Sequence, residues 1–215
     1  SQLGLARSLS EVCVSVDVCE TARSHERREC LGGESVALDT VLGPPGGRWV
    51  MLGEPGSGKS TLLRRLALDL GAGGEWLPVL LHAGELDRGT SLDLAIRVAK
   101  GEEASALVAE WPRSRLVVLV DGLDEVGKPR AARTRLQALA ADLGDATLIV
   151  AGRPEGAPEP WLGFGTLQLQ PLSKPEQERL LRKLGVSEAL IQSQLPQMRA
   201  HTRLRELVSR PLLLT

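Results

Sequence analysis

Short apolar runs alternate along this chain with stretches of helical periodicity, and this alternation constrains the fold most strongly. Each apolar run has the length of a buried strand; the runs cover 48–52, 77–82, 116–120, 147–151 and 166–170. Helical patterns separate them over 59–70, 91–110 and 129–143. Continuous apolar strands that alternate with helices are typical of a parallel sheet covered on both faces. The sequence therefore predicts an α/β fold with a mostly parallel sheet.

Three segments are expected along the chain. Residues 1–34 hold a period-two strand pattern over 9–19, followed by a charged linker. Residues 35–170 contain all five apolar runs and form the α/β domain. Residues 171–215 carry no strand pattern, so we expect a small helical subdomain there, with Ser173 as the N-cap of its first helix.

Local signals predict where individual helices end. A short helix is expected over 35–42, and the helix that begins at residue 59 is expected to stop at Gly71, a residue type favoured after a last helical turn. Two further helices are expected over 187–195 and 197–209.

Composition narrows the class of protein. The 215 residues carry a net charge of −1, which gives no signal for nucleic acid or an anionic membrane. No apolar run is long enough to span a bilayer, and the N-terminus lacks the pattern of a signal peptide. The three cysteines have no zinc-ligand spacing and read as reduced thiols. We therefore expect a cytoplasmic protein.

The stretch GEPGSGKST at 53–61 fits the pattern G-x-x-x-x-G-K-[ST] and lies between a predicted strand and a predicted helix. Glycines let the backbone approach phosphate oxygens, and successive N–H groups at the helix start face the anion. Lys59 is expected to reach the β- and γ-phosphates, and Ser60 to bind Mg²⁺. The predicted nucleotide-binding residues are Gly53, Glu54, Pro55, Gly56, Ser57, Gly58, Lys59, Ser60 and Thr61.

A second polar group follows the apolar run LVVLV. Asp121 comes directly after it and suits Mg²⁺, either directly or through water. One of Asp124 and Glu125 is expected to act as the general base on an attacking water, and the sequence does not decide between them. Arg153 follows the run TLIVA; if that strand lies between the other two, Arg153 reaches the γ-phosphate.

These motifs, in this order, resemble a NACHT domain of the STAND class of P-loop NTPases, within the wider AAA+ group. The matching stretches are GEPGSGKSTLL at 53–63, VLVDGLDEV at 118–126, LIVAGRP at 148–154 and PLLL at 211–214. The resemblance covers about residues 35–215. It implies a three-layer fold with five strands in the order 5-1-4-3-2, numbered along the chain. It also implies that ATP or ADP binds with Mg²⁺ and that Pro211 lies against the adenine.

The resemblance further implies a regulatory nucleotide switch. ADP would hold a closed form, exchange for ATP would allow self-association, and slow hydrolysis would reset the domain. Effector and sensor domains are expected in the same, longer chain, with a bacterial, NLR-like role in signalling or antiviral defence. His25, His82 and His201 do not match the histidine that senses the β-phosphate in many relatives, and are read as structural or surface residues. The winged-helix domain that carries that histidine is expected beyond this piece.

Two alternatives remain open. One is a continuously cycling AAA+-type motor, which needs an arginine finger from a neighbouring subunit; the candidates are Arg113, Arg115, Arg130 and Arg133. The other is a scaffold that keeps the phosphate-binding loop for folding only and does not hydrolyse nucleotide. The complete set of acidic residues argues against the scaffold.

Overall fold

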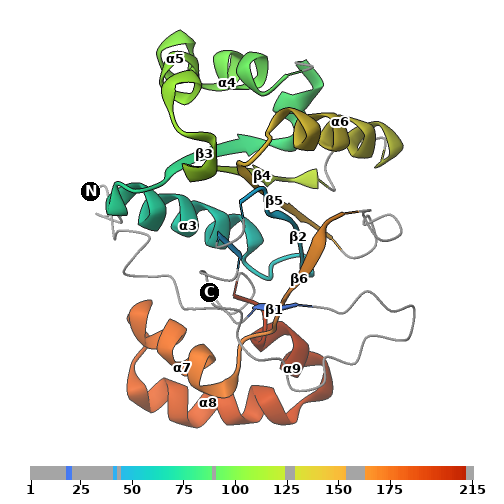
Figure 1. Cartoon of the computed structure of the whole chain (residues 1–215). Helices are drawn as coiled ribbons and strands as arrows, with labels where there is room; N and C mark the ends of the chain where they lie inside the picture. The colour runs from blue at the N-terminus through green and yellow to red at the C-terminus, as the bar shows by residue number, and fades with distance from the viewer. Residues whose placement is uncertain are drawn as a thin grey trace.

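A single twisted sheet organises the molecule (Figure 1). The computed structural model describes residues 18–20, 41–42, 45–88, 91–123, 129–153 and 163–211. The strands are β1 (Val18–Glu20), β2 (Arg48–Leu52), β3 (Leu77–His82), β4 (Leu116–Asp121), β5 (Thr147–Gly152) and β6 (Gly165–Leu169). Their order across the sheet is β1-β6-β2-β5-β4-β3. The five strands β2 to β6 are parallel, so the predicted α/β class and the predicted order 5-1-4-3-2 are confirmed.

The short strand β1 adds an antiparallel edge to these five strands. Val18 pairs with Leu169 and Glu20 pairs with Leu167, so β1 runs alongside β6. This strand overlaps the period-two pattern predicted over 9–19 at Val18 and Cys19 and continues to Glu20, which was predicted to lie in the charged linker. Residues 9–17 lie outside the described part of the chain.

Helices surround the sheet and gather at its two ends. They are α3 (Lys59–Gly73), α4 (Leu92–Lys100), α5 (Glu102–Glu110), α6 (Pro129–Asp142), α7 (Lys174–Lys183), α8 (Glu188–Ala200) and α9 (Thr202–Val208), with 3-10 turns η1 (Ala83–Arg88) and η2 (Arg113–Arg115). In Figure 1, α7, α8 and α9 lie near the β1 and β6 end of the sheet, and α4 and α5 lie beyond β3. Among the described residues, no helix is both long and apolar enough to cross a membrane.

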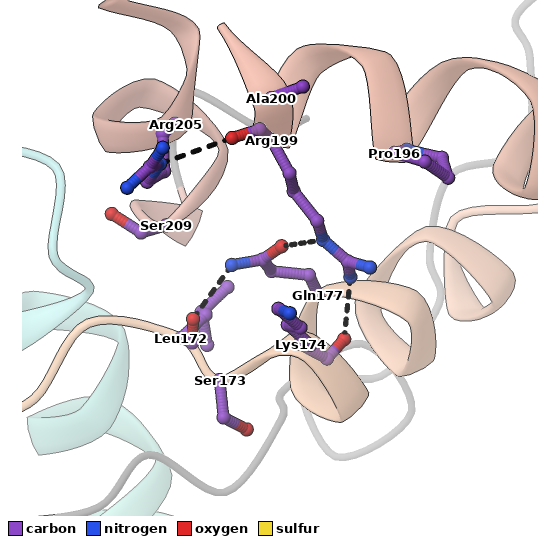
Figure 2. Close-up of a pocket in the computed structure, with 9 residues that line it drawn as sticks. All are labelled: Leu172, Ser173, Lys174, Gln177, Pro196, Arg199, Ala200, Arg205 and Ser209. Atoms are coloured by element: carbon purple, nitrogen blue, oxygen red, sulfur yellow. Dashed lines mark hydrogen bonds between the residues drawn. The ribbon is translucent and has the colours of Figure 1, made fainter. Parts of the chain in front are cut away.

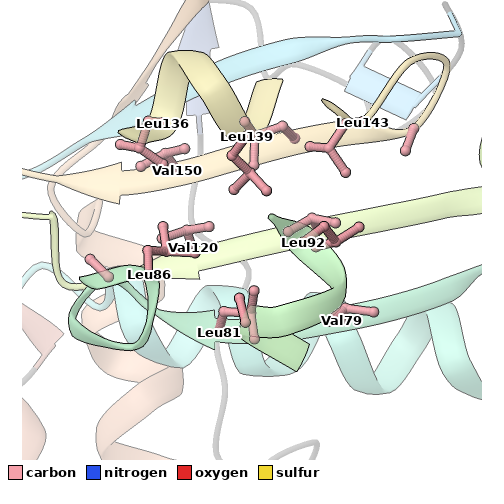
Figure 3. Packing of buried hydrophobic residues seen from close by; sticks show 14 of the residues in the cluster. Val79, Leu81, Leu86, Leu92, Val120, Leu136, Leu139, Leu143 and Val150 are labelled. Atoms are coloured by element: carbon pink, nitrogen blue, oxygen red, sulfur yellow. The ribbon is translucent and has the colours of Figure 1, made fainter. Parts of the chain in front are cut away.

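Each face of the sheet has its own apolar core, because successive strand residues point to opposite faces. On one face Val118, Val120, Leu148 and Val150 pack with residues of η1, α4, α5 and α6. Figure 3 shows Leu136 and Leu139 of α6 beside Val150, with Leu143, which follows the helix, farther along β5. It also shows Leu86 and Leu92 near Val120 and Leu81. On the other face Val117, Leu119 and Ile149 pack with Leu63 and Leu70 of α3. The central strands are thus fully buried, which explains their continuous apolar sequence.

Two predicted helix boundaries are wrong. Helix α3 continues past Gly71 and ends at Gly73, with Gly74 in the left-handed conformation (φ 70°). A methyl group on Gly71 would lie 3.6 Å from Pro78 Cγ, so close packing against β3 keeps this turn helical.

The second error concerns Pro196, which lies inside α8 rather than between two helices. The buried side chains of Ile191 and Leu195 anchor the helix before it, and Val208 of α9 joins their cluster. The next break comes at His201, and α9 begins at Thr202. The short helix predicted over 35–42 is described only at Val41 and Leu42, which are helical and buried; residues 35–40 lie outside the described part.

The helices that follow β6 are tied together by a polar network (Figure 2). Ser173 and Glu176 form a capping box at the start of α7, as predicted for the N-cap. Gln177 is buried, donates to the Leu172 carbonyl (2.8 Å) and accepts from Nε of Arg199 (2.9 Å). Arg199 also donates to Glu178 and to the Lys174 carbonyl, so α7 and α8 are joined beside a cavity of about 640 Å³. The separation of 171–215 as a subdomain stays a prediction.

Candidate functional site

The polar residues singled out in the sequence meet at one edge of the sheet. Because parallel strands end at the same edge, the residues that follow β2, β5 and β4 are neighbours. Gly53 follows β2, Arg153 follows β5, and Asp121 is the last residue of β4. The Gly53 N–H donates to the Gly152 carbonyl (3.3 Å), which joins the start of the phosphate-binding loop to the end of β5.

The loop between β2 and α3 depends on glycine backbone conformations. Gly56 (φ 76°) and Gly58 (φ 95°) lie in the left-handed region, where a side chain is strained. The Ser57 N–H donates to the Glu54 carbonyl (3.1 Å) and closes a tight turn. Within α3, the Leu62 N–H donates to the Gly58 carbonyl (2.8 Å). The N–H groups of the three residues before Leu62 therefore point out of the helix start, which has no side-chain cap.

Lys59 reaches back over this loop. Its Nζ donates to the carbonyl oxygens of Gly53 (2.7 Å) and Glu54 (3.1 Å). The ammonium group is thus held above the loop by neutral acceptors, at the place where the helix N-terminus already favours an anion.

Two further observations fit a polyphosphate at this loop. A methyl group on Gly53 would lie 2.6 Å from Oγ of Ser57, so the loop closes only around a glycine. The Ser57 hydroxyl is buried and, within the described part of the chain, has no hydrogen-bond partner. Glu54 and Pro55 are exposed on the outside of the loop, and Thr61 is exposed at the start of α3. The residues present therefore suit the phosphates of a nucleotide.

The residues expected to hold Mg²⁺ lie on two different elements. Ser60 is in the first turn of α3, and Asp121 is at the end of β4, where Oδ1 accepts from the Gly122 N–H (3.0 Å). A hydroxyl and a carboxylate are ligands that Mg²⁺ accepts, so the donor set fits this ion. Asp124 and Glu125, the two candidates for the general base, lie outside the described residues.

Strand β5 lies between β2 and β4. This is the strand arrangement on which the prediction that Arg153 reaches the γ-phosphate depends. Arg153 is exposed directly after Gly152, between the phosphate-binding loop and Asp121 along the edge. Its reach to a γ-phosphate stays a prediction.

Pro211 comes to the phosphate-binding loop from the far end of the chain. A methyl group on Gly58 would lie 3.5 Å from Cγ of Pro211. The segment before Pro211 is held by the Leu172 N–H, which donates to the Ser209 carbonyl (2.8 Å). The residue predicted to contact adenine is therefore next to the loop, although its contact with a base is untested.

Of the four arginines considered as fingers, Arg115 is engaged within the molecule. Its guanidinium lies 5.2 Å from the ring centroid of Trp76 and 3.5 Å from a Glu75 carboxylate oxygen. Arg113 and Arg115 belong to η2, at the amino end of β4. The side chains of Arg130 and Arg133 lie outside the described part.

Sequence reasoning gave His82 no role, although it lies at the same edge. His82 ends β3 and pairs in register with Asp121. The signal was available in the sequence, since LPVLLH is an apolar run that ends in a titratable residue, as the runs before Asp121 and Arg153 do.

Comparison of the sequence with models of known protein families shows which family the chain belongs to. The model of the NACHT domain matches residues 48–188, which include the phosphate-binding loop, β4, β5 and α7. The chain belongs to the NACHT family. This NACHT domain is therefore a nucleotide-binding domain of the P-loop NTPase type.

Solved structures with a similar chain trace include replication initiators. The crystal structure of a DNA replication initiation factor has 13% sequence identity and a TM-score of 0.44, and the alignment covers 79% of this chain and 51% of that one. A replication initiator DnaA bound to AMPPCP and single-stranded DNA has 13% identity and a TM-score of 0.43, with 79% and 53% covered. The NACHT chain thus spans about half the length of these two chains. No curated protein matches it.

Proposed function

We propose that this NACHT domain is a regulatory switch that binds ATP or ADP with Mg²⁺ and hydrolyses ATP slowly. The observation that carries the proposal is the proximity of Gly58, in the phosphate-binding loop, to Pro211: a methyl group on Gly58 would lie 3.5 Å from Cγ of Pro211. A nucleotide whose phosphates lie on this loop would also contact the segment around Pro211, which follows α9. Nucleotide state and the position of α7, α8 and α9 would then be coupled.

The chemistry assigned to each side chain follows from its place at the edge. Lys59 exchanges its bonds to the Gly53 and Glu54 carbonyls for phosphate oxygens. Ser60 and Asp121 would hold Mg²⁺, which would neutralise charge that develops on the phosphates. One of Asp124 and Glu125 accepts a proton from the attacking water. Arg153 pairs with the γ-phosphate and registers its loss after hydrolysis.

The coupling to a larger signalling protein is the remaining part of the proposal. Family membership supports a role in which exchange of ADP for ATP permits self-association of a cytoplasmic protein. Effector and sensor domains of the same, longer chain would be brought together by that association, in a signalling or antiviral defence response. ATP rather than GTP is proposed from family membership, since the sequence itself holds no guanine-selecting N-K-x-D motif.

The test is to denature the purified chain, identify the released nucleotide by chromatography, and measure multiple-turnover ATP hydrolysis. Bound ADP at one equivalent with turnover far below 1 s⁻¹ is the expected result. An empty site with steady turnover on the order of 1 s⁻¹ or faster, as typical enzymes show, would contradict the switch and favour the cycling motor. Unchanged turnover after substitution of both Asp124 and Glu125 by their amides would contradict their assigned role.

A further inference from the structure

The turn that leads from β4 into the acidic motif is in contact with a histidine. A methyl group on Gly122 would lie 2.4 Å from Nε2 of His82 and 3.0 Å from Cε1, so the imidazole ring packs directly on the Gly122 backbone. Gly122 also has a φ of 76°. A side chain at this position would be strained by its own backbone conformation and would collide with His82.

The imidazole is itself held in one orientation. Its Nδ1 accepts from the Gly84 N–H (3.2 Å), and the His82 backbone N–H donates to Oε2 of Glu85 (2.6 Å). Both partners belong to η1, the 3-10 turn that follows β3 directly. The other ring nitrogen, Nε2, is the atom that faces Gly122.

The other side of the same turn is closed by β5. Leu123 is buried, and a methyl group on Gly152 would lie 3.4 Å from Cβ and Cδ2 of Leu123. The turn Asp121–Leu123 is therefore clamped between His82 of β3 and Gly152 of β5. Gly152 directly precedes Arg153, the residue predicted to sense the γ-phosphate. The packing contacts of this turn therefore extend along the sheet edge from β3 to Arg153.

We propose that His82 is a positioning residue that holds the turn Asp121–Leu123, and thereby the carboxylate of Asp121, in the geometry needed for hydrolysis. This inference rests on the proposed hydrolysis of ATP. The flat imidazole ring packs against Gly122, and the hydrogen bond from the Gly84 N–H to Nδ1 fixes the orientation of the ring. Displacement of the Asp121 carboxylate would weaken the contribution of Mg²⁺, whereas the phosphate-binding loop is untouched.

The test compares His82→Ala with His82→Phe, which keeps a flat ring on Gly122. In His82→Ala we expect kcat for ATP to fall by about tenfold or more, because small misplacements of catalytic groups cost that much. The Kd for ADP without Mg²⁺ should stay within about twofold, and amide hydrogen exchange of Gly122 and Leu123 in the nucleotide-free protein should become faster. His82→Phe should recover most of the lost kcat. His201→Ala is the matched control, since it removes an exposed histidine from the helical part.

Several results would overturn the assignment. They are unchanged kcat and exchange in His82→Ala, a loss of ADP affinity as large as the loss of kcat, or a kcat of His82→Phe no higher than that of His82→Ala. If the wild-type chain shows no turnover above Lys59→Ala, the proposed hydrolysis is wrong. In that case two other measurements on His82→Ala test the positioning role by itself: amide exchange of Gly122 and Leu123, and the gain in ATP affinity when Mg²⁺ is added. If neither differs from the wild-type chain, the inference is refuted.

Discussion

Substitution of Lys59 by alanine tests the placement of the phosphates most directly. The Nζ atom of Lys59 donates to two loop carbonyls, at 2.7 and 3.1 Å, and in the bound state would donate to phosphate oxygens instead. The substitution removes a full positive charge from the loop and leaves the glycine conformations and the start of α3 in place.

The size of the effect follows from this exchange of partners. A hydrogen bond to a charged group contributes about 1.5–3 kcal/mol. Because the bonds to neutral carbonyls are given up on binding, we expect a net loss of about 2–3 kcal/mol of binding free energy. This corresponds to a Kd for ATP or ADP about 30 to 150 times higher. The free protein loses about 1 kcal/mol of stability, or 2–4 °C in Tm for a chain of this size.

Isothermal titration calorimetry with ADP and with a non-hydrolysable ATP analogue measures the change in Kd, and thermal unfolding measures the change in Tm. Lys100→Ala is the matched control, because it removes a lysine from the exposed last turn of α4. Wild-type affinity in Lys59→Ala would show that the phosphates do not lie on this loop. Equal losses of affinity in both variants would show a general effect of charge.

Three further substitutions test the fold. Leu119→Ala, at a fully buried position in β4, should lower the free energy of unfolding by about 2–5 kcal/mol in a urea titration; a loss as small as that of the exposed Leu107→Ala would contradict the packing described. Arg48→Met should cost about 2–4 kcal/mol, since its guanidinium donates to the carbonyl of Ala140 in α6 and to those of Gly144 and Ala146 in the turn that follows. The hydrogen bond from Arg182, with another from Gln192, lowers the pKa of Glu188 from its usual 4.5 to about 2. The resulting stabilisation is present above pH 4.5 and is lost as the pH falls toward 2, so Glu188→Gln should flatten the dependence of Tm on pH in that window, and an unchanged slope would refute the pairing.

The phosphate-binding loop could be predicted from sequence because its requirements are local. Gly53, Gly58 and Lys59 lie within seven consecutive residues, and the sequence directly before and after them shows the patterns of a strand and a helix. The fold class followed from the continuous apolar runs, which signal strands buried on both faces. The strand order came from the family resemblance, since periodicity alone does not say which strands are neighbours.

The errors came from contacts between residues far apart in the sequence. Gly71 and Pro196 are helix-breaking residue types, yet packing against Pro78 and the burial of Leu195 keep both turns helical. His82 was missed for a related reason. Its contact with Gly122 depends on the pairing of β3 with β4, which a single-sequence pattern does not reveal.

The register of the sheet also orders the steps by which the chain can fold during synthesis. Leu77 of β3 pairs with Leu116, and Val117 pairs with Thr147, so β3, β4 and β5 can assemble from moderately separated segments. Strand β2 is made before these three strands, but Arg48 pairs with Leu148, and Trp49 pairs with Gly165. Strand β2, which is apolar, therefore stays unpaired and prone to aggregation until most of the chain has left the ribosome. Strand β6 can join the sheet only after β2, because its two neighbours are β2 and β1. The phosphate-binding loop therefore takes its shape only once β5 has been made, and added nucleotide should favour the pairing of β2 over competing association.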